Sequence, residues 1–116
     1  MKKITIIEDE AALQDALKKA FSGEGYEITQ AFDGEEGISL VKSALPDLVL
    51  PKKHGFEVLQ EMKADETTKN IPVLVLTNLE ESTEVMKAIE LGARGYLIKA
   101  NYALKEVIAK VKDIIG

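Results

Sequence analysis

A run of three carboxylates close to the N-terminus offers the clearest chemistry in the sequence. Glu8, Asp9 and Glu10 directly follow the apolar segment Ile4–Ile7. Adjacent carboxylates repel one another, and a cation beside them favours their charged forms. A hard divalent ion such as Mg²⁺ prefers one or two carboxylates, completed by waters and a phosphate oxygen. The run is therefore a candidate Mg²⁺ site, although acidic side chains would also stabilise the start of a helix that follows them.

Two further polar side chains follow other apolar segments. Thr77 comes after Val73–Leu76, and Lys99 comes after Gly95–Ile98. A threonine hydroxyl and a lysine ammonium beside a metal ion would add a donor and a cation for a phosphoryl group. Each residue alone has a simpler role, because a threonine often ends a strand and a lysine is usually a solvated charge. Together with the carboxylates they indicate a phosphoryl-transfer site, if the fold brings them to one place.

The elements that must position these residues are short apolar runs that alternate with apolar stripes at helical spacing. The runs predict strands at Ile4–Ile7, Tyr26–Ala31, Asp47–Leu50, Val73–Thr77 and Gly95–Ile98. The stripes predict helices that carry Leu13–Phe21, Ile38–Leu45, Phe56–Met62, Val85–Ile89 and Leu104–Ile115. The alternation predicts one α/β domain over residues 1–116, a doubly wound five-stranded parallel sheet with helices on both faces. Ligands of such sheets bind beyond the carboxyl ends of the strands, where Glu8, Thr77 and Lys99 would converge.

Composition narrows the classes of function. Hydrophobic residues make up 46% and charged residues 30% of the 116 residues, which is typical of a globular domain. The net charge of −5 does not favour binding to nucleic acid or to an anionic membrane. The absence of cysteine excludes disulfides and thiolate metal sites. Glu8 interrupts the first apolar run after four residues, so we predict neither a signal peptide nor a membrane span and expect a cytoplasmic protein.

Several separated motifs make the chain similar to the receiver domain of bacterial two-component response regulators (CheY-like domains). The similarity runs from Lys3 to about Ile115 and rests on Ile6–Glu10, Phe32–Glu36, Pro46–Leu50, Pro51–Leu59, Ile71–Thr77 and Leu91–Lys99. The resemblance implies a flavodoxin-like sheet with strand order 2-1-3-4-5. It also implies a Mg²⁺ ion held by acidic residues after the first strand and an aspartate at the end of the third strand that takes phosphate from a sensor histidine kinase. Such a domain is a signalling component, and we do not expect an enzyme.

The resemblance assigns a role to each candidate residue by position. Glu8 and Asp9 would bind the Mg²⁺ ion. Thr77 would bond a phosphoryl oxygen, and Lys99 would pair with the phosphoryl group. Tyr96 would be the aromatic residue that changes rotamer on activation, with Thr77 as the other switch residue. The kinase or a downstream protein would bind the face formed by the fourth helix, the fifth strand and the last helix.

The phosphoacceptor aspartate of the family has no counterpart in this chain. In the family, the segment equivalent to Pro46–Leu50 runs on through one apolar residue to the acceptor, and a few more residues lead to a Pro-x-x-x-Gly loop. Here Leu50 is followed at once by Pro51, so about five residues are absent by comparison. Asp47 starts the third strand, and three residues at about 3.3 Å each place it roughly 10 Å from the carboxyl edge of the sheet, where the candidate site would lie. His54 is the single imidazole, but an isolated loop histidine is usually just solvated.

The shortened third strand leaves several interpretations open. Pro51 cannot donate to a strand ladder, so the predicted strand stops after four residues. The absent segment has three possible origins: residues left out of the sequence, a degenerate receiver, or a deletion made to test the fold. The predicted function is a receiver domain that is not phosphorylatable, and the alternative is a phosphate-independent protein-interaction module (a pseudo-receiver). A flavin or nucleotide binder on the same topology is disfavoured, because Glu8–Glu10 would repel a phosphate.

Overall fold

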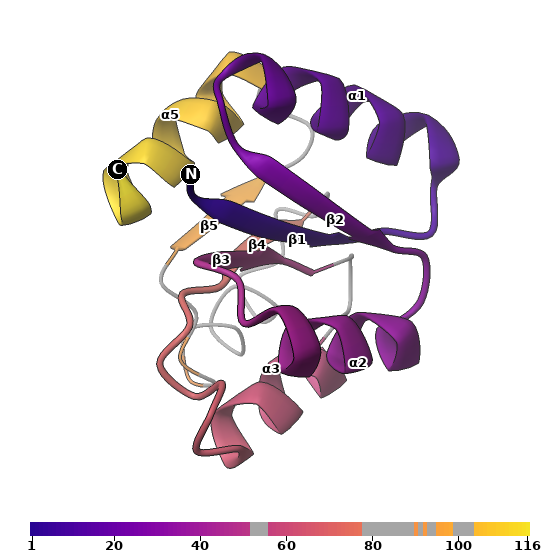
Figure 1. Ribbon diagram of the computed structural model, residues 1–116, viewed down its shortest axis with the longest axis vertical. Helices are drawn as coiled ribbons and strands as arrows, with labels where there is room; N and C mark the ends of the chain where they lie inside the picture. Colours follow the sequence, from indigo (N-terminus) through magenta and orange to yellow (C-terminus); the bar gives the residue numbers. More distant parts are fainter. Residues whose placement is uncertain (52–55, 78–89, 91, 93–94, 99–103) are drawn as a thin grey trace.

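The computed structural model describes residues 1–51, 56–77, 90, 92, 95–98 and 104–116. Strands and helices alternate in these ranges, as the sequence predicts (Figure 1). The elements are β1 (Lys3–Ile7), α1 (Ala11–Gly23), β2 (Glu27–Ala31), α2 (Gly34–Ala44), β3 (Leu48–Leu50), α3 (Phe56–Ala64), β4 (Leu74–Thr77), β5 (Gly95–Ile98) and α5 (Leu104–Ile115). The helix predicted around Val85–Ile89 lies outside the described residues.

β1 lies at the centre of a parallel ladder with the order β2-β1-β3. All five residues of β1 pair with β2, whereas three of them pair with β3. β4 and β5 form a second parallel ladder of four register pairs. In the described residues the two ladders meet at the bridge between Val49 and Val73, where Val49 N–H donates to Pro72 O at 3.0 Å. The described strands therefore follow the predicted order, and Val49 in the middle of β3 bridges to Val73, the residue before β4.

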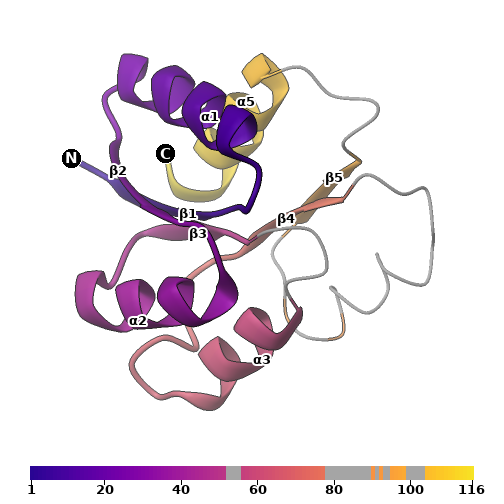
Figure 2. The same ribbon diagram turned by 90° about the vertical axis from the view of Figure 1, so that its right-hand side faces the viewer.

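Helices cover both faces of the sheet. α1 and α5 lie on one side, and α2 and α3 lie on the other (Figure 2). The core is divided accordingly. The α1/α5 side buries Ile4, Ile6, Leu17, Phe21, Tyr26, Leu48, Leu50, Leu74, Val107 and Val111. The α2/α3 side buries Ile7, Ala31, Val41, Val49, Val58, Leu59, Met62, Val73 and Val75.

α2 packs directly on the end of β1 and has well-defined ends. A Cβ atom added at Gly37 would lie 2.4 Å from Cδ1 of Ile7, so only glycine allows this approach. Asp33 caps the N-terminus, because its carboxylate accepts from Glu36 N–H at 2.8 Å. Leu45, which the apolar spacing predicts inside the helix, is instead a left-handed C-cap with φ 46° and an exposed side chain. Its right-handed conformation is disfavoured because Pro46 follows.

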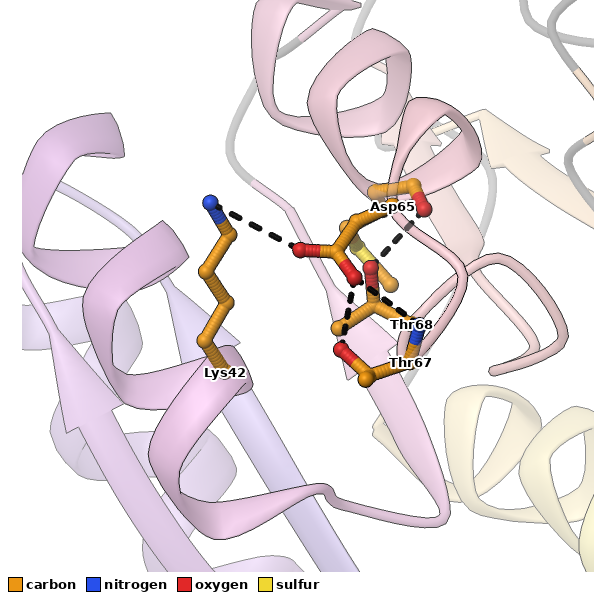
Figure 3. Close-up of polar contacts among 5 residues, drawn as sticks. Lys42, Asp65, Thr67 and Thr68 are labelled. Atoms are coloured by element: carbon orange, nitrogen blue, oxygen red, sulfur yellow. Dashed lines mark hydrogen bonds and ion pairs between the residues drawn. The ribbon is translucent and has the colours of Figure 1, made fainter.

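The connection from α3 to β4 is held by its own polar groups (Figure 3). The carboxylate of Asp65 accepts from Thr67 N–H at 2.8 Å and from Thr67 Oγ1 at 2.6 Å, and Lys42 Nζ of α2 lies 3.8 Å from it. These contacts, the Thr67 hydroxyl first, lower the pKa of Asp65. The fully buried Thr68 donates to Met62 O at 2.8 Å. The turn therefore has a fixed shape where the chain enters the Val49–Val73 bridge.

Candidate functional site

Glu8 is the innermost of the three carboxylates that follow β1. Its side chain is 7% exposed, whereas Asp9 and Glu10 are exposed. Glu8 N–H donates to Ala31 O at 3.0 Å, and Glu8 Oε2 accepts from Glu10 N–H at 2.9 Å. Glu10 is the N-cap residue of α1, yet its side chain makes no cap hydrogen bond, and the first turn of α1 has no acidic residue. Side-chain capping of α1 by Glu10 therefore does not account for this acidic run.

Gln14 of α1, which the sequence did not single out, completes this turn. Its side chain is 1% exposed, and its Nε2 lies 2.6 Å from Ala31 O, 3.0 Å from Ile6 O and 3.3 Å from Glu8 O. Carbonyl oxygens only accept hydrogen bonds, so the amide must turn its NH₂ group towards them. A glutamine on a helix usually faces solvent, and no sequence signal distinguishes this one.

Gln30 of β2 fixes the other side of the same amide. Gln30 Nε2 donates to Gln14 Oε1 at 3.0 Å and to the Gln14 backbone carbonyl at 3.1 Å. The two glutamines therefore link α1 to the ends of β1 and β2. We call Gln14 and Gln30 the glutamine clamp.

The structure describes the backbones of two other predicted site residues, which lie in β4 and β5. Thr77 is the last residue of β4 and pairs with Ile98, the last residue of β5. Tyr96 pairs with Val75 in the middle of β5. The side chains of Thr77 and Tyr96 are not among those described, and Lys99 and His54 lie outside the described residues. All the described strand pairs are parallel, so β1, β4 and β5 point their carboxyl ends to the same side (Figure 2).

β3 brings no carboxylate to this edge. Leu48, Val49 and Leu50 are all buried and apolar, and the buried Pro51 follows them. Asp47 lies at the opposite edge of the sheet, because its carboxylate accepts from Lys3 N–H at 2.8 Å, where β1 begins. The prediction that Asp47 lies away from the carboxyl edge of the sheet is thus confirmed.

The carboxylates at the end of β1 are of the chemical type that Mg²⁺ binds. Mg²⁺ usually keeps several waters and takes one or two protein carboxylates, which Glu8 and Asp9 could supply. Among the residues that the structure describes, no group of three or more acidic or histidine side chains is placed to hold a metal. The described residues therefore do not by themselves form a complete metal site.

Comparison with known sequences gives a consistent family match. The family model described as "Response regulator receiver domain" matches residues 4–112. The DNA-binding dual master transcriptional regulator RpaA of Synechocystis is 36% identical over 120 residues, which cover 99% of this chain and 49% of that protein. The probable transcriptional regulator ycf27 of Porphyridium aerugineum is 33% identical, covering 97% of this chain and 48% of that protein. The chain spans about half the length of these relatives.

Solved structures share the fold along nearly the whole chain. The chemotaxis protein CheY4 of Vibrio cholerae is similar with a TM-score of 0.90 at 21% identity, covering 98% of each chain. A response regulator from Chloroflexus aurantiacus, described as putative, gives a TM-score of 0.90 at 26% identity, covering 98% of this chain and 97% of that one. The flavodoxin-like, CheY-like fold expected from the sequence is therefore confirmed.

Proposed function

The chain belongs to the response regulator receiver domain family, and on that premise we propose that it keeps the acidic end of β1 but does not accept a phosphoryl group. It is a receiver domain of a two-component response regulator. In this proposal residues 1–116 form one such domain, by itself or as a piece of a longer regulator, and it signals rather than acts as an enzyme.

One observation carries the proposal: β3 ends at Leu50 without reaching a carboxylate. Each of its three residues is buried and apolar, and Pro51 follows directly. An acyl phosphate needs a carboxylate oxygen as nucleophile beside the metal, and Asp47 lies at the other edge of the sheet.

The remaining site residues keep the roles that the resemblance assigns. Glu8 and Asp9 hold Mg²⁺ weakly, because the acceptor carboxylate that would complete the site is absent. Thr77 is the last residue of β4, and Lys99 follows the last residue of β5 in the sequence. Both would face a phosphoryl group, and Tyr96 would change rotamer on activation. In the absence of an acceptor, these three residues have no covalent phosphoryl group to bind.

A sensor histidine kinase or a downstream protein is the proposed partner, on the face that includes β5 and α5. α5 buries Val107 and Val111 against the sheet and leaves a charged outer surface, including Lys105 and Glu106. None of the helices in the described ranges is both long and apolar enough to cross a membrane. We propose a cytoplasmic location and no binding of nucleic acid by this domain.

Intact-mass measurement after incubation with acetyl phosphate and Mg²⁺ tests the proposal. The starting mass is compared with 12.7 kDa, because a heavier chain would contain the acceptor segment after all. We expect no phosphoryl adduct. An adduct that is lost in the H54A variant would assign a phosphohistidine, and an adduct cleaved by hydroxylamine would show an acyl phosphate; either result contradicts the proposal.

A phosphate-independent interaction module is the second candidate, and the same short β3 favours it. Such a module would bind its partner through the face that includes β5 and α5, whatever the state of the acidic end. A pull-down from lysate with and without EDTA distinguishes the candidates. Partner capture that persists in EDTA, without phosphodonor, favours the module, and capture that needs both Mg²⁺ and phosphodonor excludes it.

A further inference from the structure

We propose that Gln14 is the positioning residue of the acidic run, because its side chain fixes the β1–α1 turn from which Glu8 and Asp9 project. This inference rests on the proposed cation-binding role of these two carboxylates. It concerns a residue that touches no ligand and acts through the backbone of Glu8.

The contacts of Gln14 surround one short stretch of backbone. Its Nε2 reaches the carbonyl oxygens of Ile6 and Glu8, the residues on either side of Ile7. It also reaches Ala31 O, the same atom that accepts the N–H of Glu8. Gln14 and Glu8 are therefore joined through a shared acceptor, and movement of one changes the hydrogen bond of the other.

Gln14 is itself held too firmly to move with the turn. Its backbone N–H donates to Glu10 O at 3.0 Å in the first turn of α1. Its Oε1 accepts from Gln30 Nε2, which sets the orientation of the amide. The side chain is almost fully buried, so water does not compete for these hydrogen bonds. A rigid donor at this place gives the carboxylates a fixed starting direction, as partners behind metal ligands commonly do.

The test compares the full chain with Q14M and V111A. Gln14→Met keeps an unbranched side chain of similar length but cannot donate. Val111 is fully buried in α5, and Val111→Ala lowers stability without touching the turn. Amide hydrogen exchange then reports local opening. Relative to the unmodified chain, we expect the exchange rates of Glu8 N–H and Glu10 N–H to rise more in Q14M than the rate of Tyr26 N–H. Tyr26 follows α1, and its N–H donates to Phe21 O near the other end of that helix. V111A should show no such difference.

Cation affinity provides the second readout, with Mn²⁺ as the probe and electron paramagnetic resonance of the free ion as the measurement. Loss of a partner behind a metal ligand weakens affinity by about tenfold or more, so we expect that change in Q14M and less than about twofold in V111A. Equal exchange at Glu8 in Q14M and V111A would overturn the inference, as would unchanged Mn²⁺ affinity in Q14M.

Two outcomes separate this inference from the proposed function. If the unmodified chain binds no Mn²⁺, the proposed cation site is wrong. The inference about cation binding is then wrong too, even if hydrogen exchange shows that the turn loosens in Q14M. If Q14M does not fold, Gln30→Met is the second variant, because it removes the two hydrogen bonds from Gln30 to Gln14 and keeps the Gln14 side chain. We then expect the same changes at smaller size, and no change at Glu8 N–H in Q30M contradicts the inference.

Discussion

β1 joins β2 through five register pairs, a hydroxyl contact of 2.8 Å between Thr5 and Thr29, and the glutamine clamp. β3 joins β4, in the described residues, through one bridge and the bond from Val49 N–H to Pro72 O. The acidic run leaves the first region. The phosphoacceptor of a receiver domain would leave the second.

This difference explains how the chain can keep one half of the family's site and lack the other. Glu8 is held by contacts to Ala31, Glu10 and Gln14, and none of these contacts involves β3. Shortening β3 after Leu50 therefore removes the acceptor while leaving these three contacts of Glu8 in place. This difference predicts that lengthening β3 restores phosphorylation, whereas changes beside β1 and in the turn before β4 alter stability.

Lengthening β3 should have the largest effect. A segment of about five residues between Leu50 and Pro51, with one apolar residue, one aspartate and three apolar residues, would extend the strand to the carboxyl edge. We expect Mg²⁺-dependent phosphorylation by acetyl phosphate, seen by intact mass, where the unmodified chain shows none. The matched control carries asparagine in place of the inserted aspartate and should stay unphosphorylated. Equal labelling of both insertions would show that the acceptor lies elsewhere.

Crowding the contact between α2 and β1 should give the next largest effect. Gly37→Ala places a methyl group 2.4 Å from Cδ1 of the buried Ile7. Overpacking of this kind costs about 1–3 kcal/mol of unfolding free energy, measured by urea denaturation. Ile7→Ala removes Cδ1, Cγ1 and Cγ2, the three atoms within 3.0 Å of the added methyl group, so Gly37→Ala should cost less in that background. An undiminished cost would mean that the clash with Ile7 is not the cause.

The sequence anticipated the elements much better than the contacts between them. Apolar spacing located every described strand and helix, because burial of one face imposes a period on the chain. It misplaced Leu45, since local backbone restriction before Pro46 overrides the apolar pattern. It could not identify the glutamine clamp, because the acceptors of Gln14 are backbone carbonyls that any residue type supplies. The carboxylates at the end of β1 were found because their type and position carry the signal.

Removing the hydroxyl contact between β1 and β2 should have a moderate effect. Thr5 is fully buried, and Thr5→Val keeps its shape while leaving Thr29 without that partner. A typical hydrogen bond contributes about 0.5–1.5 kcal/mol, and we expect a loss of this size in urea denaturation. Adding Thr29→Val should recover part of the loss, because the pair is then replaced as a whole. If the two losses simply add, the contact does not stabilise this side.

The turn before β4 should show the smallest effect, which is present at neutral pH and disappears as the pH falls. Because the Thr67 hydroxyl, the Thr67 N–H and Lys42 lower the pKa of Asp65 in the folded state, its ionised form stabilises the fold. This stabilisation is present above the ordinary pKa of 3.8 and is lost as the pH falls through the lower folded value. Thermal melting should therefore fall less steeply below that pH in D65N than in the unmodified chain. Parallel profiles would show that Asp65 does not contribute.

One NMR titration tests the central claim, that the carboxylates after β1 bind Mg²⁺ although the chain has no phosphoacceptor aspartate. In a ¹⁵N-labelled sample, added Mg²⁺ should shift the amide signals of Glu8, Asp9 and Glu10 and leave that of Lys3, at the opposite edge, in place. Subsequent addition of acetyl phosphate should change nothing further. An absence of Mg²⁺-induced shifts at these three residues, or a second set of shifts on adding the phosphodonor, would contradict the account.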